Sequence, residues 1–277
     1  MPEGGQLVRF RHRRSTLRNL PPLGLWHNEE VAMSETGLIR LSRLMALRRE
    51  LDTIANNVAN VGTNGFKAQR SEFKEALKHV ERNVLDNKPE RPVSLVQVSS
   101  GFMDQSHGAI EPTGSGLHAA VEGEGYFVVQ TPQGERFTRN GAFTLDGAGR
   151  LVTATGQSVL GPSGPIIVSS GDGLPTINPD GSISTSRGIV GTLRLVRFAQ
   201  PRSLVPVGGN LFRSDQRSVE LPAGERRLIP GSLERSNVRP VVEMGRLVEV
   251  TRAYELVAAM MKEDKNENKL QRLADVL

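Results

Sequence analysis

The sequence has no cysteine, few aromatic residues and no long apolar run. The absence of cysteine excludes disulfide bonds, thiolate metal sites and cysteine nucleophiles. Aromatic residues make up 4% of the 277 residues and apolar residues 37%, so a single thick core is not expected. No stretch approaches the roughly 18 apolar residues of a membrane span, and we expect no stable membrane insertion. The composition favours an extended or two-part protein.

Charge is moderate and mixed in sign. The 35 basic and 30 acidic residues give a net charge of +5, which alone could suggest nucleic-acid binding. The two signs are interspersed, however, and aromatic residues do not accompany the basic ones as a stacking surface would require. We therefore expect no nucleic-acid partner.

Residues that could carry out chemistry are not grouped in any recognisable pattern. The five histidines are scattered without metal-ligand spacing. Asp146-Gly147-Ala148-Gly149 lacks the remaining ligands of a calcium loop and is typical of a hairpin turn. Gly123-Glu124-Gly125 precedes an expected strand, so no helix N-terminus follows to hold phosphate. We expect no catalytic residue, no metal site and no cofactor, and an enzyme is the weakest of the functional alternatives.

Apolar residues recur at helical spacing near both ends of the chain. The first stripe lies in a helix expected from about residue 34 to 59, and the second in a helix that begins near Pro240, after possible caps at Ser236 and Asn237. Each stripe is too narrow to form a core by itself, so each helix needs the other end of the chain or a neighbouring copy as its partner. The predicted seam residues at subunit interfaces are Leu44, Leu47, Leu51, Ile54 and Val58, and Met244, Leu247, Tyr254, Ala258 and Met261.

The segment between these helices has the pattern of short strands and turns. Tyr126–Val129 is an expected strand, and hairpins are expected around residues 143–153 and 177–183, where Asp-Gly turns separate apolar runs. A further helical piece is expected over residues 71–84, before the prolines at 89 and 92. The predicted fold class is α+β, with a mainly β middle domain rich in hairpins.

The first 32 residues differ from the rest. They contain five arginines and no lysine, two adjacent prolines at Pro21 and Pro22, and no periodicity. A disordered tail is one interpretation. The other is a mis-annotated start, with translation beginning at Met33, next to the first helix.

The most distinctive segment is residues 55–67, Ala-Asn-Asn-Val-Ala-Asn-Val-Gly-Thr-Asn-Gly-Phe-Lys. Three asparagines within five residues offer amides that can bond the backbone or a neighbouring subunit. A turn and an apolar anchor follow them. An ordinary helix exit does not explain this density of amides. The candidate motif residues are Asn56, Asn57, Asn60, Thr63, Gly65 and Phe66.

This segment resembles the signature of the flagellar rod and hook proteins of bacteria. Further matches to that family follow in its order, at residues 121–130, 136–143, 149–153, 156–161, 208–212 and 233–238. The resemblance extends from about Met33 to the C-terminus, and those 245 residues (277 − 32) are similar in length to proximal-rod subunits. One departure is Leu117-His118, where the family usually has Leu-Asp, so no role is transferred to His118.

The resemblance implies a structural role. The terminal helices would form a coiled-coil layer of a hollow rod that acts as the drive shaft for motility, with the β-rich middle outside it. Implied partners are other proximal and distal rod subunits and the flagellar type III export apparatus. The implied location is the basal body. The corresponding division of the chain is 1–32, a rod-helix region 33–85, a β-rich outer domain 86–230, and a second rod helix 231–277.

Two alternatives remain beside this interpretation. A distal-rod or hook-type subunit would share the same motifs, although a hook subunit would need a larger middle domain. A secreted β-rich binding or cap module with a coiled-coil stalk would also fit the two stripes.

Overall fold

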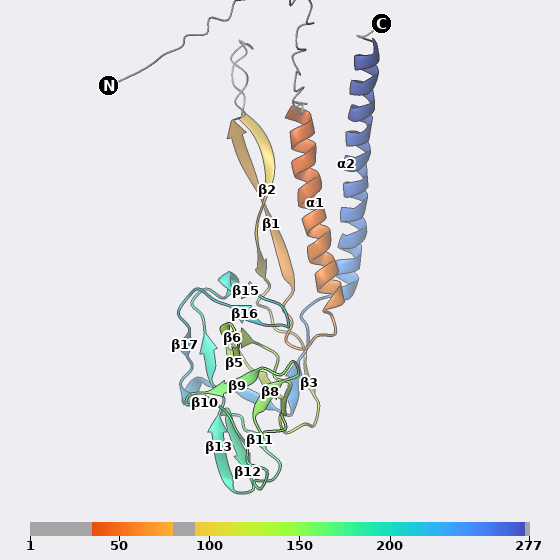
Figure 1. Ribbon diagram of the computed structural model, residues 1–277. Coiled ribbons are helices and arrows are strands. Elements are labelled where there is room, and N and C mark those ends of the chain that lie inside the picture. Colours follow the sequence, from red (N-terminus) through yellow and green to blue (C-terminus); the bar gives the residue numbers. More distant parts are fainter. Residues whose placement is uncertain (1–34, 80–91, 275–277) are drawn as a thin grey trace, which may run out of the picture. The chain divides into compact units, whose positions relative to one another are not determined.

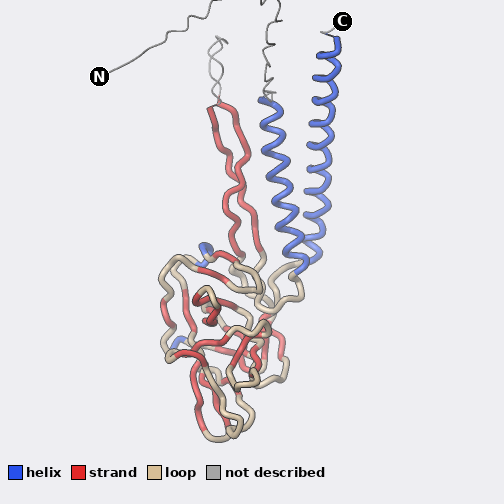
Figure 2. The backbone as a smooth tube through the Cα atoms, viewed as in Figure 1, coloured by secondary structure: helices blue, strands red, loops and turns tan. Residues whose placement is uncertain are grey.

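The computed structural model describes residues 35–79 and 92–274 (Figure 1). Residues 1–34, 80–91 and 275–277 lie outside the described residues, and so do the expected tail, the possible start at Met33 and the domain boundary at residue 85. The two long helices are α1, Glu35–Ala59, and α2, Pro240–Ala274, with strands between them (Figure 2). The predicted α+β class is confirmed.

Both helices have ends that the sequence explains. α1 ends at Ala59, and the amide of Asn60 donates to the carbonyls of Asn56 and Asn57 at 3.2 and 3.1 Å. Pro240 opens α2, because a residue in the first helical turn needs no backbone N–H. Within the described residues, neither helix combines the length and apolar character that crossing a bilayer requires.

A long antiparallel hairpin follows α1. Its strands are β1, Gln69–His79, and β2, Pro92–Met103, and both contact α1. The prediction of a helix over residues 71–84 is therefore wrong for residues 71–79, which belong to β1. Residues 80–84 lie outside the described residues. The backbone of β1 is paired along its length with β2, whose β-branched residues favour a strand, and this pairing overrides a local helical pattern.

The middle of the chain forms short strands around two apolar cores. The largest sheet contains ten described strands in the order β15-β16-β6-β5-β9-β8-β7, with β10 beside β9 and with β14 between β5 and β17. Separate sheets are formed by β11-β12-β13, by β4 with β18 and by β3 with β19. The bounds are β3 Ile110–Pro112, β4 Ala119–Val121, β5 Tyr126–Thr131, β6 Gly134–Thr138, β7 Phe143–Leu145, β8 Leu151–Thr153, β9 Ser158–Gly161, β10 Gly164–Pro165, β11 Thr176–Ile177, β12 Ser182–Thr185, β13 Gly188–Thr192, β14 Leu195–Arg197, β15 Val205–Pro206, β16 Phe212–Arg213, β17 Val219–Glu220, β18 Leu228–Pro230 and β19 Ser232–Glu234. Short 3-10 turns lie at Pro201–Ser203 and Ala223–Glu225.

Strand β5 lies between the two cores. Phe127 and Val129 pack in one cluster with Leu151, Ile177 and Ile183, while Tyr126 and Val128 pack in the other with aromatic residues such as Phe198. Alternate side chains of a strand point to opposite faces, so a strand buried on both faces must be apolar throughout. This explains the unbroken run Tyr-Phe-Val-Val.

The predicted hairpins are confirmed. Strands β7 and β8 pair across Asp146–Gly149, and Gly149 has the positive φ, +76°, that this turn requires. Strands β11 and β12 pair at Ile177 and Ile183, with Gly181 at φ +83°. The remaining strands bring distant segments together, because β18 and β19, which lead into α2, pair with β4 and β3.

Substitution of Gly141 tests how closely the backbone just before β7 packs against β4. A Cβ at Gly141 would lie 1.7 Å from the carbonyl oxygen of Ala119, whereas one at Gly147 would meet no atom within 4 Å. We expect Gly141→Ala to lower the free energy of unfolding by about 1–3 kcal/mol or more, since backbone must move to accept the methyl group. The matched control Gly147→Ala should leave it unchanged. Equal urea midpoints for the two variants would contradict the packing.

Candidate assembly surface and its junction

Helices α1 and α2 pack against each other in opposite directions. Arg246 of α2 forms an ion pair with Glu50 of α1 at 3.0 Å, and Arg40 of α1 donates to the carbonyl of Met260 at 3.3 Å. Arg40, near the start of α1, therefore meets Met260 in the later part of α2, and Glu50 meets Arg246 near the start of α2, so the two helices are antiparallel. The two ends of the described chain are each other's partner, which was one of the two possibilities that the stripes allowed.

The predicted seam residues differ in burial. Ile54 is 1% exposed, and Leu44, Leu47, Leu51 and Val58 of α1 are half-buried. In α2 the half-buried seam residues are Leu247, Tyr254, Ala258 and Met261, whereas Met244 is 55% exposed.

The face of α2 that packs within the chain is rotated from the predicted stripe. Its buried residues are Glu243, Val250 and Val257, which repeat every seven residues. Glu243 and Val257 lie one position before Met244 and Ala258, two members of the expected stripe. The shift follows from Glu243, a charged residue that a hydrophobic pattern would place outside.

Asn57 joins three elements at the base of the helix pair. Its side chain is fully buried, its Oδ1 accepts from the amide of Gln69 at 2.8 Å, and its Nδ2 donates to the Gln69 carbonyl at 2.9 Å. The same Nδ2 donates to Oε2 of Glu243 at 3.3 Å. One amide therefore pairs with the backbone of β1 and with the first turn of α2, as only a side chain with both donor and acceptor can.

Glu243 is fully buried and is neutralised by basic partners. Arg70 of β1 lies 2.5 Å from its Oε1, and Arg246 of α2 lies 3.8 Å from its Oε2. A buried carboxylate without such partners would cost several kcal/mol. The position of this carboxylate fixes the rotation of α2 about its axis.

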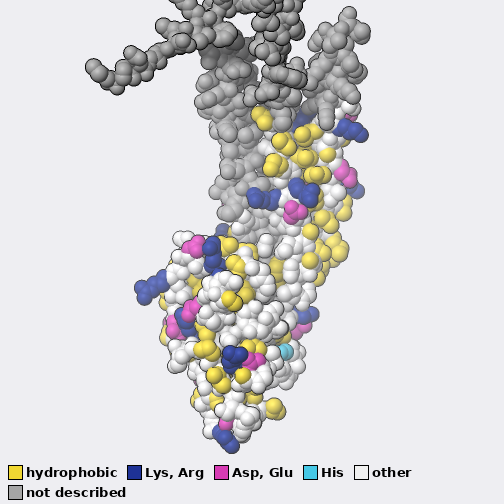
Figure 3. Space-filling view, in the orientation of Figure 1, with side chains coloured by type: hydrophobic (Ala, Val, Ile, Leu, Met, Phe, Trp, Pro, Cys, Tyr) yellow, Lys and Arg dark blue, Asp and Glu magenta, His cyan; other side chains and the backbone are white. Residues whose placement is uncertain are grey.

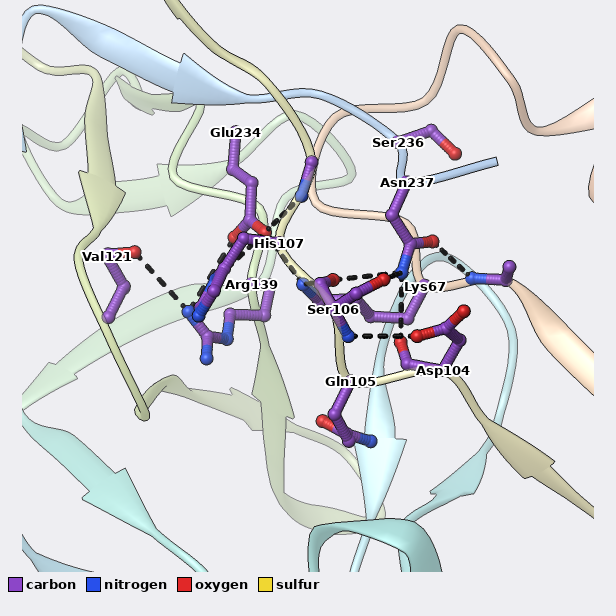
Figure 4. A network of polar contacts seen from close by, with 12 residues as sticks. Lys67, Asp104, Gln105, Ser106, His107, Val121, Arg139, Glu234, Ser236 and Asn237 are labelled. Carbon is purple, nitrogen blue, oxygen red and sulfur yellow. Dashed lines mark hydrogen bonds and ion pairs between the residues drawn. The ribbon is translucent and has the colours of Figure 1, made fainter. Parts of the chain in front are cut away.

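A second buried charge cluster lies where α1 and α2 join the β strands (Figure 4). Nζ of Lys67 lies 2.7 Å from Oε1 of Glu234, and both side chains are 1% exposed. Arg139 lies 3.6 Å from the other Glu234 oxygen and donates to the Gly123 carbonyl at 2.8 Å. Burial lowers the pKa of Lys67 below its usual value, and the nearby Glu234 carboxylate opposes this shift.

Asn237 extends this network, rather than capping α2 as expected. Its Oδ1 accepts from the amide of Ala68 at 2.7 Å, and its Nδ2 donates to the carbonyls of Asp104 and Ser106 at 3.0 and 2.9 Å (Figure 4). The residues just before α2 are thereby fixed to the segments on either side of the β1–β2 hairpin.

The remaining motif residues shape the exit from α1. Asn60 donates to the Asn56 carbonyl at 2.8 Å and accepts from Thr63 at 3.1 Å, while the Asn56 side chain is exposed. Gly65 has φ +67°, and a Cβ there would lie 2.5 Å from the backbone of Arg139. Phe66 is buried with Ala68 and Val238. Most of these residues thus have contacts within the chain.

The outward face of α2 carries large apolar side chains that stay exposed among the described residues. Figure 3 shows hydrophobic side chains gathered over the helical part of this view, with basic and acidic side chains among them. Exposed fractions reach 82% at Val241, 51% at Val248 and 58% at Leu256. The complete set on α2 is Val241, Val242, Met244, Val248, Leu256 and Met260. This set is called the outer stripe of α2 below.

No candidate for chemistry emerges in the described part of the chain. There, no group of three or more His, Asp or Glu side chains could hold a metal. A small pocket is lined by Tyr126, Arg139 and His107, but Arg139 is engaged with backbone carbonyls and burial raises the pKa of Tyr126. The Nδ1 atom of His118 lies 2.8 Å from the hydroxyl of Thr113, so this departure from the family pattern has a local structural contact.

Sequence reasoning missed the buried charges at the junction between the helices and the β strands, which are Lys67, Glu234 and Glu243. The partners of Lys67 and Arg70 lie 167 and 173 residues away, so no local pattern pairs them. The one available signal was the density of asparagines beside Lys67, which identified the segment without giving its contacts.

Substituting each of two adjacent asparagines tests the junction. Asn57→Asp removes the amide donor and places a carboxylate beside the buried Glu243, so we expect a loss of about 3–5 kcal/mol in unfolding free energy. The matched control Asn56→Asp adds the same charge at an exposed side chain and should change it by less than about 0.5 kcal/mol. Urea unfolding measures both. Equal effects would contradict the assigned role of Asn57.

Three family models match successive parts of the chain. A model described as flagella basal body rod protein matches residues 38–67, the flagellar hook protein FlgE/F/G D1 domain matches 120–185, and the flagellar basal body rod FlgEFG protein C-terminal model matches 229–267. These segments cover most of α1 and its exit, the strands from β4 to β12, and β19 with most of α2.

Curated relatives align over most of their length. FlgF of Caulobacter vibrioides is 37% identical over 80% of this chain and 90% of the relative. FlgF of Mesorhizobium japonicum is 34% identical over 83% and 93%, and FlgG of Bacillus subtilis is 32% identical over 78% and 89%. The chain belongs to the family of bacterial flagellar basal-body rod proteins.

Proposed function

We propose that this chain is a structural subunit of the flagellar basal-body rod and that it polymerises through its terminal helices. Family membership supports the structural role and the location in the basal body. The relatives are structural rod proteins, so the chain is a structural protein rather than an enzyme.

The single observation that carries self-association is the outer stripe of α2. After α1 has covered one face of α2, the opposite face still exposes Val241, Met244, Val248 and Leu256 by half or more. Covering such a face is favourable by roughly 25 cal/mol per Å² of apolar area. Large exposed apolar patches of this kind mark interaction sites.

We further propose that the paired helices form the inner coiled-coil layer of the rod. The seam residues Leu47, Leu51 and Ile54 of α1, with Leu247, Tyr254 and Met261 of α2, would hold the pair together. The pair would then be the unit that packs against neighbouring subunits. Axial contacts between unlike surfaces would let the assembly extend instead of closing.

The proximal-rod FlgF type is the proposed subtype. The two FlgF relatives are 37% and 34% identical to the chain, and the FlgG relative is 32% identical. The small difference keeps the distal-rod type as the second candidate. Proposed partners are the other rod subunits and, from the family resemblance, the flagellar type III export apparatus.

Charging the outer stripe tests polymerisation. Val248→Asp and Leu256→Asp replace exposed side chains, so both variants should keep the melting temperature of the parent protein. In a strain made non-motile by deletion of the gene, each variant should fail to enter purified basal bodies and fail to restore swimming in soft agar. A carboxylate in a dry helix interface costs several kcal/mol, which is enough to prevent assembly.

The matched control is Leu174→Asp, which charges an exposed apolar residue of the β region, 91% exposed. This variant should swim normally. Normal incorporation of both α2 variants would contradict self-association through the helices.

A further inference from the structure

The small pocket beside Tyr126, called the Tyr126 pocket below, has the dimensions and walls of a ligand site. Its volume is about 110 Å³, which is room for several water molecules. The rings of Tyr126 and Phe198 are both buried and meet edge to face, with centroids 5.8 Å apart, and Pro201 continues this wall. The pocket can therefore hold a small molecule with an apolar part.

Arg139 brings a nitrogen without a partner to this pocket. Its side chain is 4% exposed, and its two Nη atoms donate to the carbonyls of Val121 and Gly123 at 3.4 and 2.8 Å. Its Nε has no hydrogen-bond acceptor among the residues that the structure describes. A buried N–H group without an acceptor is unfavourable, so an acceptor that enters the pocket is stabilised there.

The charge of Arg139 is only partly neutralised. Its ion-pair partner Glu234 lies 3.6 Å from Nη1, which is longer than a hydrogen bond (Figure 4). The same carboxylate lies 2.7 Å from Nζ of Lys67 and 3.6 Å from Nδ1 of His107. Asp104 is a further acidic group that acts on Lys67. Because Glu234 is shared in this way, an anion beside Arg139 would be favoured.

Gln105 supplies a second donor to the Tyr126 pocket. The hydroxyl of Tyr126 donates to its Oε1 at 2.8 Å, and this contact fixes the orientation of the amide. Its Nε2 makes long contacts, 3.5 and 3.4 Å, with the carbonyls of Met103 and Pro201. Hydrogen bonds of that length are weak, so Nε2 retains the capacity to donate to a ligand.

The rim of the pocket limits the charge of the ligand. Glu124 is exposed and lines the opening, whereas Arg197 is paired with Glu225 at 3.0 Å. The Glu124 carboxylate opposes additional negative charge on a ligand. In addition, a single free N–H of Arg139 cannot form the fork of two hydrogen bonds with which a free guanidinium holds phosphate or sulfate. A monovalent anion with two oxygens and a small apolar group fits these constraints.

We propose that the Tyr126 pocket binds a small monocarboxylate of the size of acetate or propionate. One carboxylate oxygen accepts from Nε of Arg139 and the other from Nε2 of Gln105, and the alkyl group lies against Phe198. The site belongs to the β region and includes no residue of the outer stripe of α2. The inference is therefore independent of the proposed polymerisation.

Nuclear magnetic resonance of the full chain labelled with ¹⁵N tests the site directly. Sodium acetate should shift the Nε–H signal of Arg139 in a saturable way, and sodium chloride at the same ionic strength should not. Sulfate should bind at least about tenfold more weakly than acetate, because the site offers one N–H of Arg139 and a negative rim. The absence of a saturable acetate shift, or equal affinity for sulfate, would overturn the proposal.

Two substitutions and a matched control test the residues. Gln105→Glu replaces the second donor with a carboxylate of the same size and should weaken acetate binding by at least about tenfold. Glu124→Gln removes the negative charge of the rim and should tighten binding by about two- to fivefold. The control Glu122→Gln changes an equally exposed carboxylate that does not line the pocket and should leave the affinity unchanged.

The variants also distinguish a specific site from a general effect of charge. If Glu122→Gln tightens binding as much as Glu124→Gln, acetate responds to the charge of the surface and the site is overturned. Unchanged acetate affinity in Gln105→Glu overturns it as well. Glu124→Gln replaces an exposed side chain and should keep the melting temperature of the parent, so its result does not depend on a change in folding.

Discussion

The position of one buried carboxylate, that of Glu243, determines which face of α2 is available to other molecules. The carboxylate is fully buried in the first part of the helix, and Arg70, Arg246 and Asn57 surround it. A charge can stay in such a place only while these partners hold it, so the helix cannot turn about its axis without a large cost. Val250 and Val257 thereby lie on the buried face of α2, and the outer stripe lies on the opposite, exposed face.

The second cluster of buried charges, where the helices join the β strands, also depends on partners of opposite sign. Lys67, directly after the exit of α1, and Glu234, at the end of β19, neutralise each other out of contact with water. Asn57 and Asn237 use their amides to pair with backbone groups of the β1 strand and its surroundings. The family motif therefore connects the helices to the β strands, and the side-chain amides of Asn57 and Asn60 make contacts within the chain.

The sequence predicted what local patterns determine. Both helices, the exit at Asn60 and the turns at Asp146–Gly149 and near Gly181 follow from periodicity and turn residues, and the family motifs in their order identified the family. The face of α2 that packs within the chain lies one position before the predicted stripe, because a hydrophobic pattern cannot anticipate a buried glutamate whose partner Arg70 is 173 residues away. The strand β1 was taken for a helix because its structure depends on pairing with β2, which no local pattern shows.

The central claim is that other subunits cover the outward face of α2 in the rod. The chain contains no cysteine, so Val248→Cys provides one unique thiol on that face, and Leu174→Cys provides a reference thiol on the β region. The measurement is the rate of reaction with a water-soluble maleimide in the free subunit and in purified basal bodies. The account predicts that the Val248→Cys thiol reacts readily in the free subunit and at least about tenfold more slowly in basal bodies, corresponding to about 1.4 kcal/mol of protection. Equal rates for this thiol in the free and assembled states would contradict it.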